Sequence, residues 1–544
     1  MSFDQLVLFL QNLLDRFVRR VRLGPAPVPA GRRLLIVQID GLARAVLERA
    51  VAGGQAPFLA HLLRRHDHRL QPMSVGLPTS TPTFQLAAMY GVRPDIPGFR
   101  YHDRRHGADV YFPRGGDAAR VEAAQAGGRL GIMHGGSTYG CVFTGGATNS
   151  LFSFARIKRP TGVGLLQAVS ALLVLGWVFL KSLTMSLVEI ARTLLRLVAD
   201  PVGESARGWK WLAIKIGISV WLRELFTLSV SRDLYAGVPA VYVNYLDYDV
   251  VAHAYGPRHR RALRALRRID HSILQLWRVL RRVPEHRYDL YVLSDHGVAA
   301  SVPYTRVSGG RSLEDVLLDE LLDARRGEGG GTTRRRHLAA GLRGYRAGRA
   351  PGLFQRFLNY LESDFPWVLG EGRAAREPRP VRVLVAGPNA FVYFLDAAEA
   401  LTIERIDERH PGLAEEISRG RGIGFVLARA GTGPVCVWRG KRYRLGEGEA
   451  GPFAGREDLP VVLDGLRALM AMPSAGDLVI YGIGAPEGHV SFLPELGAHA
   501  GPSPEELHTF IIHPPEITLP SPISDPVQLY GHFVRYQEST ETAA

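Results

Sequence analysis

The sequence predicts an α/β fold built around a mainly parallel central sheet. Three short apolar runs, at residues 34–40, 241–246 and 288–293, are predicted to be buried strands, because parallel strands covered on both faces carry continuous apolar residues. An amphipathic, arginine-rich helix is predicted at about residues 258–282, between the last two runs. The order strand, helix, strand indicates a parallel sheet with helical crossovers.

The composition is that of a globular protein and favours anionic partners. With 544 residues, of which 46% are apolar and 22% charged, the chain is neither disordered nor fibrous, and it can form about two to four domains or one large α/β unit with insertions. The formal net charge of +14 favours nucleic acid, phosphate esters or an acidic membrane surface. Two cysteines, Cys141 and Cys436, are too few for a disulfide framework or a cysteine-rich zinc site.

Two parts of the chain predict contact with a membrane. Residues 1–22 have apolar side chains at helical spacing, and because their basic residues follow the apolar ones, we do not expect a cleavable signal peptide. The apolar segments 162–180 and 209–230 favour a helical hairpin in or on a membrane. The alternatives are a first helix docked on the protein's own core and a buried helical cap in place of the hairpin. We expect a bacterial-type inner membrane, and the flanking arginines leave the side of the membrane open.

Acidic residues follow all three predicted strands. Asp40 ends the first run, Asp249 follows the second with His253 four residues later, and Asp295 and His296 follow the third. Because ligands of parallel sheets collect at the carboxyl ends of the strands, these side chains are expected to share one site. Carboxylates and imidazoles are ligands for zinc and related metals, so this pattern predicts a metal-dependent hydrolytic centre.

A threonine and a late histidine complete the set of candidate residues. Thr81 precedes a proline and an apolar, helix-like run, so it is expected where backbone N–H groups and the helix dipole favour a phosphoryl group. An ordinary N-cap role is the alternative for this threonine. His499 lies in a glycine-flanked loop as a further candidate ligand, and its competitors are His489, His508 and His513.

The order of these residues resembles the alkaline phosphatase superfamily, and most closely its nucleotide pyrophosphatase/phosphodiesterase-like branch. The branch typically shows Pro-Thr-x-Thr and, ten residues after the nucleophile, a Gly-x-x-Pro-x-x-x-Gly turn, which this chain has at residues 78–81 and 91–98. The motifs Asp-x-x-x-His-x-x-Gly-Pro and Ser-Asp-His-Gly match residues 249–257 and 294–297. The late Gly-x-His-Gly motif is kept only in part, because Ala500 replaces its second glycine.

The resemblance implies an alkaline phosphatase-like three-layer sandwich with a mainly parallel central sheet, into which the helical hairpin is inserted. It also implies two divalent metal ions, zinc by preference with manganese or iron as alternatives. One would be held by Asp249, His253 and His499, and the other by Asp40, Asp295, His296 and Thr81. Thr81 would be the nucleophile and would form a phosphothreonine intermediate that water hydrolyses.

One position departs from the family pattern. The branch usually carries an asparagine that holds a phosphate oxygen, and this chain has His102 there. The resemblance therefore implies that His102 or the nearby Arg100 binds the substrate.

The predicted function is a metal-dependent phosphohydrolase or phosphodiesterase acting on lipid-linked or nucleotide phosphate esters. Phosphoryl or phosphoethanolamine transfer at the membrane is a related alternative. A non-catalytic membrane- or polyanion-binding protein on the same scaffold is a second alternative, against which the complete set of candidate ligands argues. Sulfatase chemistry is not expected, because neither cysteine precedes x-Pro-x-Arg. A phosphate ester and membrane lipid are the expected partners, and the oligomeric state is left open.

The motifs divide the chain into seven segments. The basic stretch 326–350 is predicted to be a flexible, solvated surface, and without an aromatic stacking pattern we expect no specific nucleic-acid recognition. The segments are an N-terminal helix and linker (1–30), a first part of the catalytic core with the nucleophile (31–155), the apolar hairpin (156–235), a second part of the core with metal ligands (236–325), a basic flexible segment with helices (326–380), a third part of the core with the last histidine (381–520) and a C-terminal tail (521–544).

Overall fold

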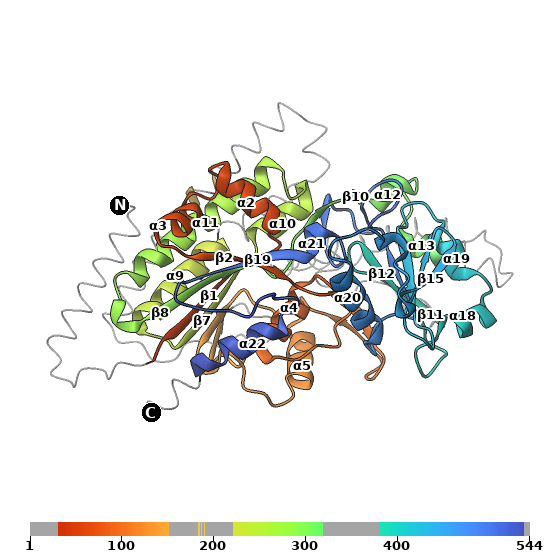
Figure 1. Cartoon of the computed structure of the whole chain (residues 1–544), viewed down its shortest axis with the longest axis horizontal. Coiled ribbons are helices and arrows are strands. Elements are labelled where there is room, and N and C mark those ends of the chain that lie inside the picture. Colours follow the sequence, from red (N-terminus) through yellow and green to blue (C-terminus); the bar gives the residue numbers. More distant parts are fainter. Residues whose placement is uncertain are drawn as a thin grey trace, which may run out of the picture.

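A seven-stranded, mainly parallel sheet forms the centre of the molecule in a computed structural model, which describes residues 31–151, 183–184, 186–187, 190, 221–318 and 380–537. The strand order is β2-β19-β8-β1-β7-β5-β6, and only β19 runs antiparallel to its neighbours (Figure 1). The strands are β1 (Arg33–Ile39), β2 (Arg69–Ser74), β5 (Ser137–Tyr139), β6 (Asn149–Leu151), β7 (Ala240–Tyr245), β8 (Tyr288–Leu293) and β19 (His508–His513). The predicted α/β class is confirmed, and the three predicted apolar runs are β1, β7 and β8.

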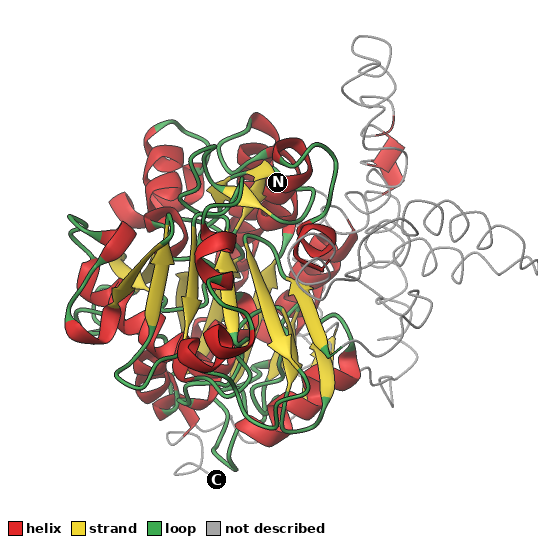
Figure 2. Ribbon diagram, turned by 90° about the vertical axis from the view of Figure 1, so that its right-hand side faces the viewer, coloured by secondary structure: helices red, strands yellow, loops and turns green. Residues whose placement is uncertain are grey.

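Helices cover both faces of this sheet and make the molecule three-layered (Figure 2). Alternate residues of β1 explain why its sequence is continuously apolar: Leu35 and Val37 lie in the core on one face, whereas Leu34 and Ile36 lie in the core on the other. The first face is covered by α2 (Arg44–Ala52), α3 (Pro57–Arg65), α9 (Arg223–Ala236), α10 (Asp247–Tyr255) and α11 (Arg260–Leu280). The second is covered by α4 (Thr81–Tyr90), α5 (Gly115–Gln125) and α22 (Val527–Phe533).

A second, six-stranded sheet is built from residues 381–481 and is antiparallel throughout. Its order is β11-β12-β16-β13-β14-β15, and its two faces bury separate apolar clusters. Its strands are β11 (Val381–Val385), β12 (Asn389–Phe394), β13 (Phe425–Ala428), β14 (Val435–Trp438), β15 (Lys441–Arg444) and β16 (Leu478–Tyr481), accompanied by α18 (Ile403–Arg409), α19 (Leu413–Ser418) and α20 (Leu459–Ala471).

Short elements connect the two sheets. The hairpin of β3 and β4 contacts the second sheet through an ion pair between Arg104 and Asp477, and Ser474 donates hydrogen bonds to Asp95. The remaining strands and α-helices that the structure describes are β3 (Arg100–Asp103), β4 (Ala108–Tyr111), β9 (Ala299–Ala300), β10 (Val302–Pro303), α12 (Tyr304–Val307), α13 (Leu313–Asp315), β17 (Val490–Ser491), β18 (Gly497–Ala498) and α21 (Pro504–Leu507).

The C-terminal helix α22 lies within the segment predicted to be a tail and packs against α4. The buried Tyr536 hydroxyl donates to the Asp289 carboxylate on β8 at 2.7 Å, and Arg32 pairs with the same carboxylate. The first and last parts of the described chain therefore meet at one buried acidic residue.

The predicted membrane segments fall mostly on residues outside those described. Residues 1–30, nearly all of 326–380 and most of 156–235 are not described, and α9 occupies the end of the last segment. Among the residues that the structure describes, no helix combines the length and the apolar character needed to cross a bilayer. The hairpin, the N-terminal helix and the basic loop stay predictions.

Gly91, which ends α4, gives a test of how this helix is held. It adopts φ +67°, and a Cβ added there would lie 2.4 Å from Cδ1 of Tyr530 on α22. We expect Gly91→Ala to lower the free energy of unfolding by about 2 kcal/mol or more in urea denaturation, because strain and a steric clash add together. Gly107→Ala is the control, with φ +61° and no atom within 4 Å of the added Cβ, and should cost about 1 kcal/mol. Equal losses would mean that the contact with α22 does not matter.

Candidate active site

The predicted acidic residues converge because β1 lies between β7 and β8 and runs parallel to both. Asp40 follows β1 directly, Asp249 lies in the first turn of α10 after β7, and Asp295 follows β8. Asp40 is 3% exposed and Asp295 is fully buried. The shared strand direction thus brings three carboxylates to one edge of the sheet, as the sequence predicted.

The first group of possible metal ligands contains Asp40, Asp295 and His296, whose ligand atoms lie within 4.8 Å of one another. His296 Nε2 is 3.5 Å from Asp40 Oδ1 and 3.4 Å from Asp295 Oδ2. The Thr81 hydroxyl joins this group, 3.5 Å from Asp40 Oδ1 and 3.2 Å from His296 Nε2. These four residues are the set that the resemblance assigns to one metal.

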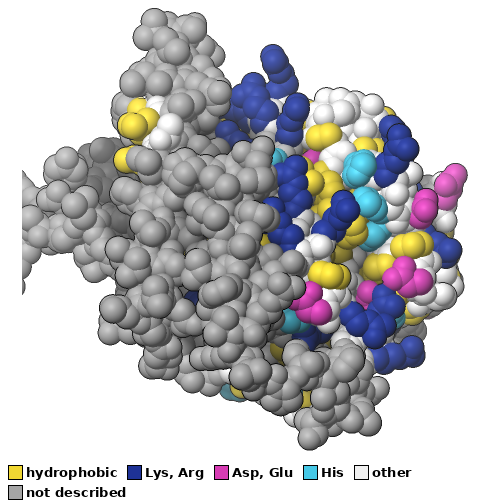
Figure 3. Space-filling model, turned by 90° about the vertical axis from the view of Figure 1, so that its left-hand side faces the viewer, with side chains coloured by type: hydrophobic (Ala, Val, Ile, Leu, Met, Phe, Trp, Pro, Cys, Tyr) yellow, Lys and Arg dark blue, Asp and Glu magenta, His cyan; other side chains and the backbone are white. Residues whose placement is uncertain are grey.

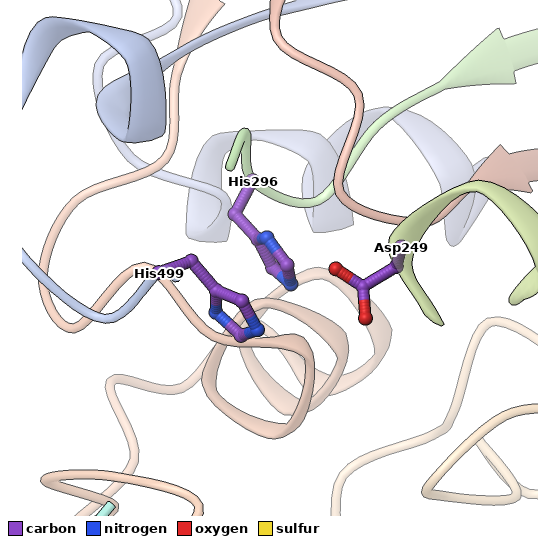
Figure 4. A group of neighbouring side chains, drawn as sticks. All are labelled: Asp249, His296 and His499. Atoms are coloured by element: carbon purple, nitrogen blue, oxygen red, sulfur yellow. The ribbon is translucent and has the colours of Figure 1, made fainter. Parts of the chain in front are cut away.

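The second group contains Asp249, His296 and His499, which approach from three separate parts of the chain (Figure 4). The rings of His296 and His499 are stacked, with centroids 3.7 Å apart and planes inclined by 17°. His253 lies beside this group, with Nε2 at 3.3 Å from Asp249 Oδ2 and its ring 5.0 Å from that of His499. The structure therefore brings all seven predicted ligands together, with His296 common to both groups and His253 at the margin of the second.

Thr81 is the first residue of α4, and the N-cap of that helix is Ser80. The alternative interpretation, in which Thr81 is an ordinary N-cap, is therefore wrong. The neighbouring hydroxyls are directed elsewhere: Thr79 donates to the carbonyl of Gly501, and Thr83 donates to the carbonyl of Ile96. Of the four hydroxyls at residues 79–83, it is that of Thr81 which contacts Asp40 and His296.

Electrostatics in this site favour a bound cation. Burial raises the pKa of Asp40 and Asp295, and the charges of neighbouring carboxylates raise both further. Burial lowers the pKa of His296 and His499, which keeps both imidazoles neutral and able to donate a lone pair. Burial acts to raise the pKa of Asp249, but the adjacent His253 outweighs it and lowers that pKa.

Buried oxygens without a hydrogen-bond partner support the same interpretation. Among the described residues, Asp295 Oδ2 and Asp249 Oδ1 lack such a partner although both atoms are buried. Unsatisfied buried acceptors are rare and call for an explanation such as an ion. Three carboxylates with neutral imidazoles are ligands that zinc, manganese and iron accept, so the residues present fit a divalent metal pair.

Several positioning residues were not predicted from the sequence. Asn244 on β7 donates to Asp40 Oδ2 at 2.7 Å, Glu495 Oε2 lies 2.8 Å from His253 Nδ1, and the Thr79 carbonyl lies 2.8 Å from His499 Nδ1. Gly41 is required by close packing, because a Cβ there would lie 2.5 Å from Asp249 Oδ1. Such partners fix the orientation of metal-binding side chains.

The contacts described for His102 are with the β3–β4 hairpin and the second sheet. Its Nδ1 lies 2.9 Å from Asp109 and 3.3 Å from Arg382, and its ring packs edge-on against Tyr393. These contacts explain its burial without a substrate. The substrate-binding roles of His102 and of Arg100, on the same strand, stay predictions.

The other three late histidines that were candidate ligands make polar contacts away from this site. His508 Nε2 lies 2.7 Å from Asp458, His489 Nδ1 accepts from the backbone N–H of Gly484, and His513 Nδ1 lies 2.9 Å from the carbonyl of Pro514. The structure thus selects His499 from the four late histidines as the one beside Asp249.

Comparison with known proteins agrees with this geometry. The profile of the family described as type I phosphodiesterase / nucleotide pyrophosphatase matches residues 211–347. The predicted resemblance is thereby confirmed. The matched part of the chain includes Asp249, His253, Asp295 and His296, and it supports the assignment as a phosphoester hydrolase.

Solved structures give a more distant likeness. Two crystal structures of phosphonoacetate hydrolase from Sinorhizobium meliloti 1021, with phosphonoformate and with phosphonoacetate, are each 14% identical in sequence to this chain. Each alignment covers 93% of this chain and 96% of the other, with TM-scores of 0.45 and 0.44. No curated protein matches the sequence.

Glu495→Gln tests whether the contact with His253 supports metal binding. We expect the variant to bind zinc or manganese about 10- to 100-fold more weakly, because the neutral amide no longer orients and polarises the imidazole. The measurement is competition with a chromogenic chelator on purified protein. Glu399→Gln, at an exposed position outside the site, is the control and should bind like the unmodified protein. Equal affinities in both variants would remove Glu495 from the metal site.

Proposed function

We propose that this protein hydrolyses phosphate esters through a phosphothreonine formed on Thr81, with lipid-linked or nucleotide phosphate esters as the substrate class. The observation that carries the proposal is the position of the Thr81 hydroxyl, in the first turn of a buried helix and in contact with both Asp40 and His296. The match to the phosphodiesterase family supports the reaction class. Membrane association stays a prediction.

The metal ligands would divide as the motifs imply. Asp40, Asp295, His296 and Thr81 would hold one divalent ion, and Asp249, His253 and His499 the other. Bound ions of this kind supply charge neutralisation for the phosphoryl oxygens and lower the pKa of oxygen ligands. Zinc, manganese and iron all suit the carboxylate and imidazole donors.

The proposed reaction consists of two substitution steps at phosphorus. In the first, the Thr81 oxygen loses its proton and bonds to phosphorus, while the bond from phosphorus to the ester oxygen breaks and the leaving group departs as a protonated alcohol. In the second, water adds to the phosphothreonine and restores the threonine hydroxyl with release of the phosphate product. The N–H groups in the first turn of α4 and the helix dipole favour the negative charge of the phosphoryl group in both steps.

The burial of the carboxylates around Thr81 also limits how many of them can be ionised at the same time. Asp40 and Asp295 repel one another, so a cation between them is the arrangement that allows both to ionise. A binding protein without catalysis would have no need to hold a hydroxyl in the middle of such a cluster. The hydrolytic role therefore explains more of the site than a polyanion-binding role.

Thr81→Ala tests the nucleophile. Hydrolysis of bis-p-nitrophenyl phosphate and of p-nitrophenyl phosphate should fall by about three orders of magnitude or more, and no phosphoprotein should be trapped by acid quench. Thr83→Ala, which removes a hydroxyl directed at Ile96 in the same helix, should retain turnover within about threefold. Full turnover by Thr81→Ala would remove this threonine as the nucleophile.

Chelation tests the metal requirement. Dialysis against a strong chelator should abolish turnover of both substrates, because Thr81 then lacks the charge that activates its oxygen. Return of two equivalents of zinc, manganese or iron should restore it, and the most effective ion identifies the metal. Turnover that persists in protein shown by elemental analysis to be metal-free would contradict the two-metal assignment.

A further inference from the structure

Two glutamines are buried in the core between the central sheet and α4. On one side of the molecule Lys, Arg and His side chains lie at the surface, as is usual for polar groups (Figure 3). Gln38 on β1 and Gln85 on α4 are instead fully buried, in a core that also contains Leu34 and Ile36. Burying an amide costs free energy that an apolar side chain of similar size would not cost, so these two glutamines call for a role.

The two residues, here called the glutamine pair, link separate segments of the chain by hydrogen bonds. The backbone N–H of Val142, in the loop after β5, donates to Gln85 Oε1 at 2.8 Å, and Gln85 Nε2 donates to Gln38 Oε1 at 3.1 Å. Tyr242 on β7 donates its hydroxyl to the same Gln38 oxygen at 2.7 Å, and burial raises the pKa of Tyr242, which keeps this hydroxyl protonated. Because a backbone N–H can only donate, Val142 fixes the orientation of the Gln85 amide.

The glutamine pair repeats, one helical turn further on, the contact between α4 and the end of β1 that Thr81 makes with Asp40. Thr81 and Gln85 are four residues apart on α4, whereas Gln38 lies on β1 and Asp40 directly follows that strand. Four helical residues rise about 6 Å and two strand residues about 6.6 Å, so the two contacts form at matching heights. Together they set both the axial position and the rotation of α4 relative to β1.

Hydrogen bonds at the start of α4 give a fixed point of their own. Thr79 bonds to residues 499–501 before the helix begins, and the hydroxyls of Ser80 and Thr83 contact one another in its first turn. A helix that is held only there can still turn or tilt about that point, and apolar packing is not directional. The glutamine pair supplies a second, directional contact one turn beyond Thr81.

The glutamine pair also borders the residue that donates to Asp40. Gln38 and Asn244 are directly paired in the parallel ladder of β1 and β7, so their side chains lie on the same face of the sheet. Asn244 Nδ2 donates to Asp40 Oδ2 at 2.7 Å. Within the described part of the chain, Gln38 Nε2 is a buried donor and Asn244 Oδ1 a buried acceptor without a partner. This complementary donor and acceptor bring the glutamine pair and the Asp40 contact into one polar layer.

We propose that Gln85 and Gln38 are positioning residues, which hold the Thr81 oxygen in the place needed for attack on phosphorus. The inference rests on the proposed function, in which Thr81 is the nucleophile. A displacement of about 1 Å in a reacting group can lower a rate about 100-fold. Such a displacement acts on the chemical step and not on substrate binding, so its effect falls on kcat and leaves KM nearly unchanged.

Gln85→Met tests the proposal in the full, metal-loaded protein, because methionine has a similar length, donates no hydrogen bond and accepts only weakly. We expect kcat for bis-p-nitrophenyl phosphate to fall about 10- to 100-fold, with KM within about threefold of the unmodified protein. Tyr90→Phe is the matched control. It removes a buried hydrogen bond at the other end of the same helix, from Tyr90 to Glu122 at 2.8 Å, and should keep kcat within about threefold.

Two further measurements accompany the kinetics. Circular dichroism and thermal unfolding establish that each variant is folded at the assay temperature, and elemental analysis should give the metal content of the unmodified protein. Gln38→Met removes the same contact from β1 and takes the place of Gln85→Met if that variant does not fold. When both fold, the double variant should lose about as much kcat as Gln85→Met alone, because residues that act as a unit are not additive.

Four results would overturn the proposal. These are equal kcat in Gln85→Met and Tyr90→Phe, a raised KM with unchanged kcat, losses that multiply in the double variant, and loss of metal together with turnover. In the last case the glutamine pair would support the metal ligands and not the nucleophile. Absence of turnover in the unmodified protein contradicts the proposed function and this inference together, whereas full turnover by Gln85→Met contradicts the inference alone.

Discussion

Mutual repulsion among buried and partly buried carboxylates is the constraint on which the rest of this structure depends. Asp40, Asp249 and Asp295 lie at one edge of the central sheet because three parallel strands end there. Such an arrangement is unfavourable without compensation, since burial and like charge both oppose ionisation. The fold compensates with Asn244 as a donor to Asp40, with the adjacent His253 on Asp249, and with a geometry suited to divalent ions.

The second sheet and the loops that follow it complete the centre from a distant part of the chain. Glu495 and His499 come after β16, yet both contact residues that follow β7 and β8. Thr79 links this late segment to the start of α4, because its hydroxyl and its carbonyl bind residues 499–501. Thr81 and His499 are therefore positioned by the same few hydrogen bonds.

The fold class, the edge of the sheet that carries the site and the seven candidate ligands could be predicted because each leaves a local pattern. Continuous apolar runs predict β1, β7 and β8, and an acidic residue after each run marks the edge. Glu495 left no such pattern, since 242 residues separate it from His253 and a lone glutamate in a loop has many ordinary roles. Asn244, a polar residue within an apolar strand, is the kind of positioning residue that the sequence could have indicated.

The position of His253 beside the group of Asp249, His296 and His499, rather than within it, could not be predicted either. The i, i+4 spacing places Asp249 and His253 on one side of α10, but the stacking of His296 on His499 depends on loops that are distant in sequence. Likewise, the partners of His102 are residues of β4, β11 and β12, which no local spacing relates to β3.

The position of β19 has a consequence for biosynthesis. This strand, residues 508–513, lies between β2 and β8, and it is the only link between those two strands in the sheet order. Until the ribosome has released it, β8 presents an unpaired edge, and β2 has no partner in the sheet. The chain as far as residue 513 must therefore emerge before the sheet can close, and the β8 edge stays open to wrong pairing until then.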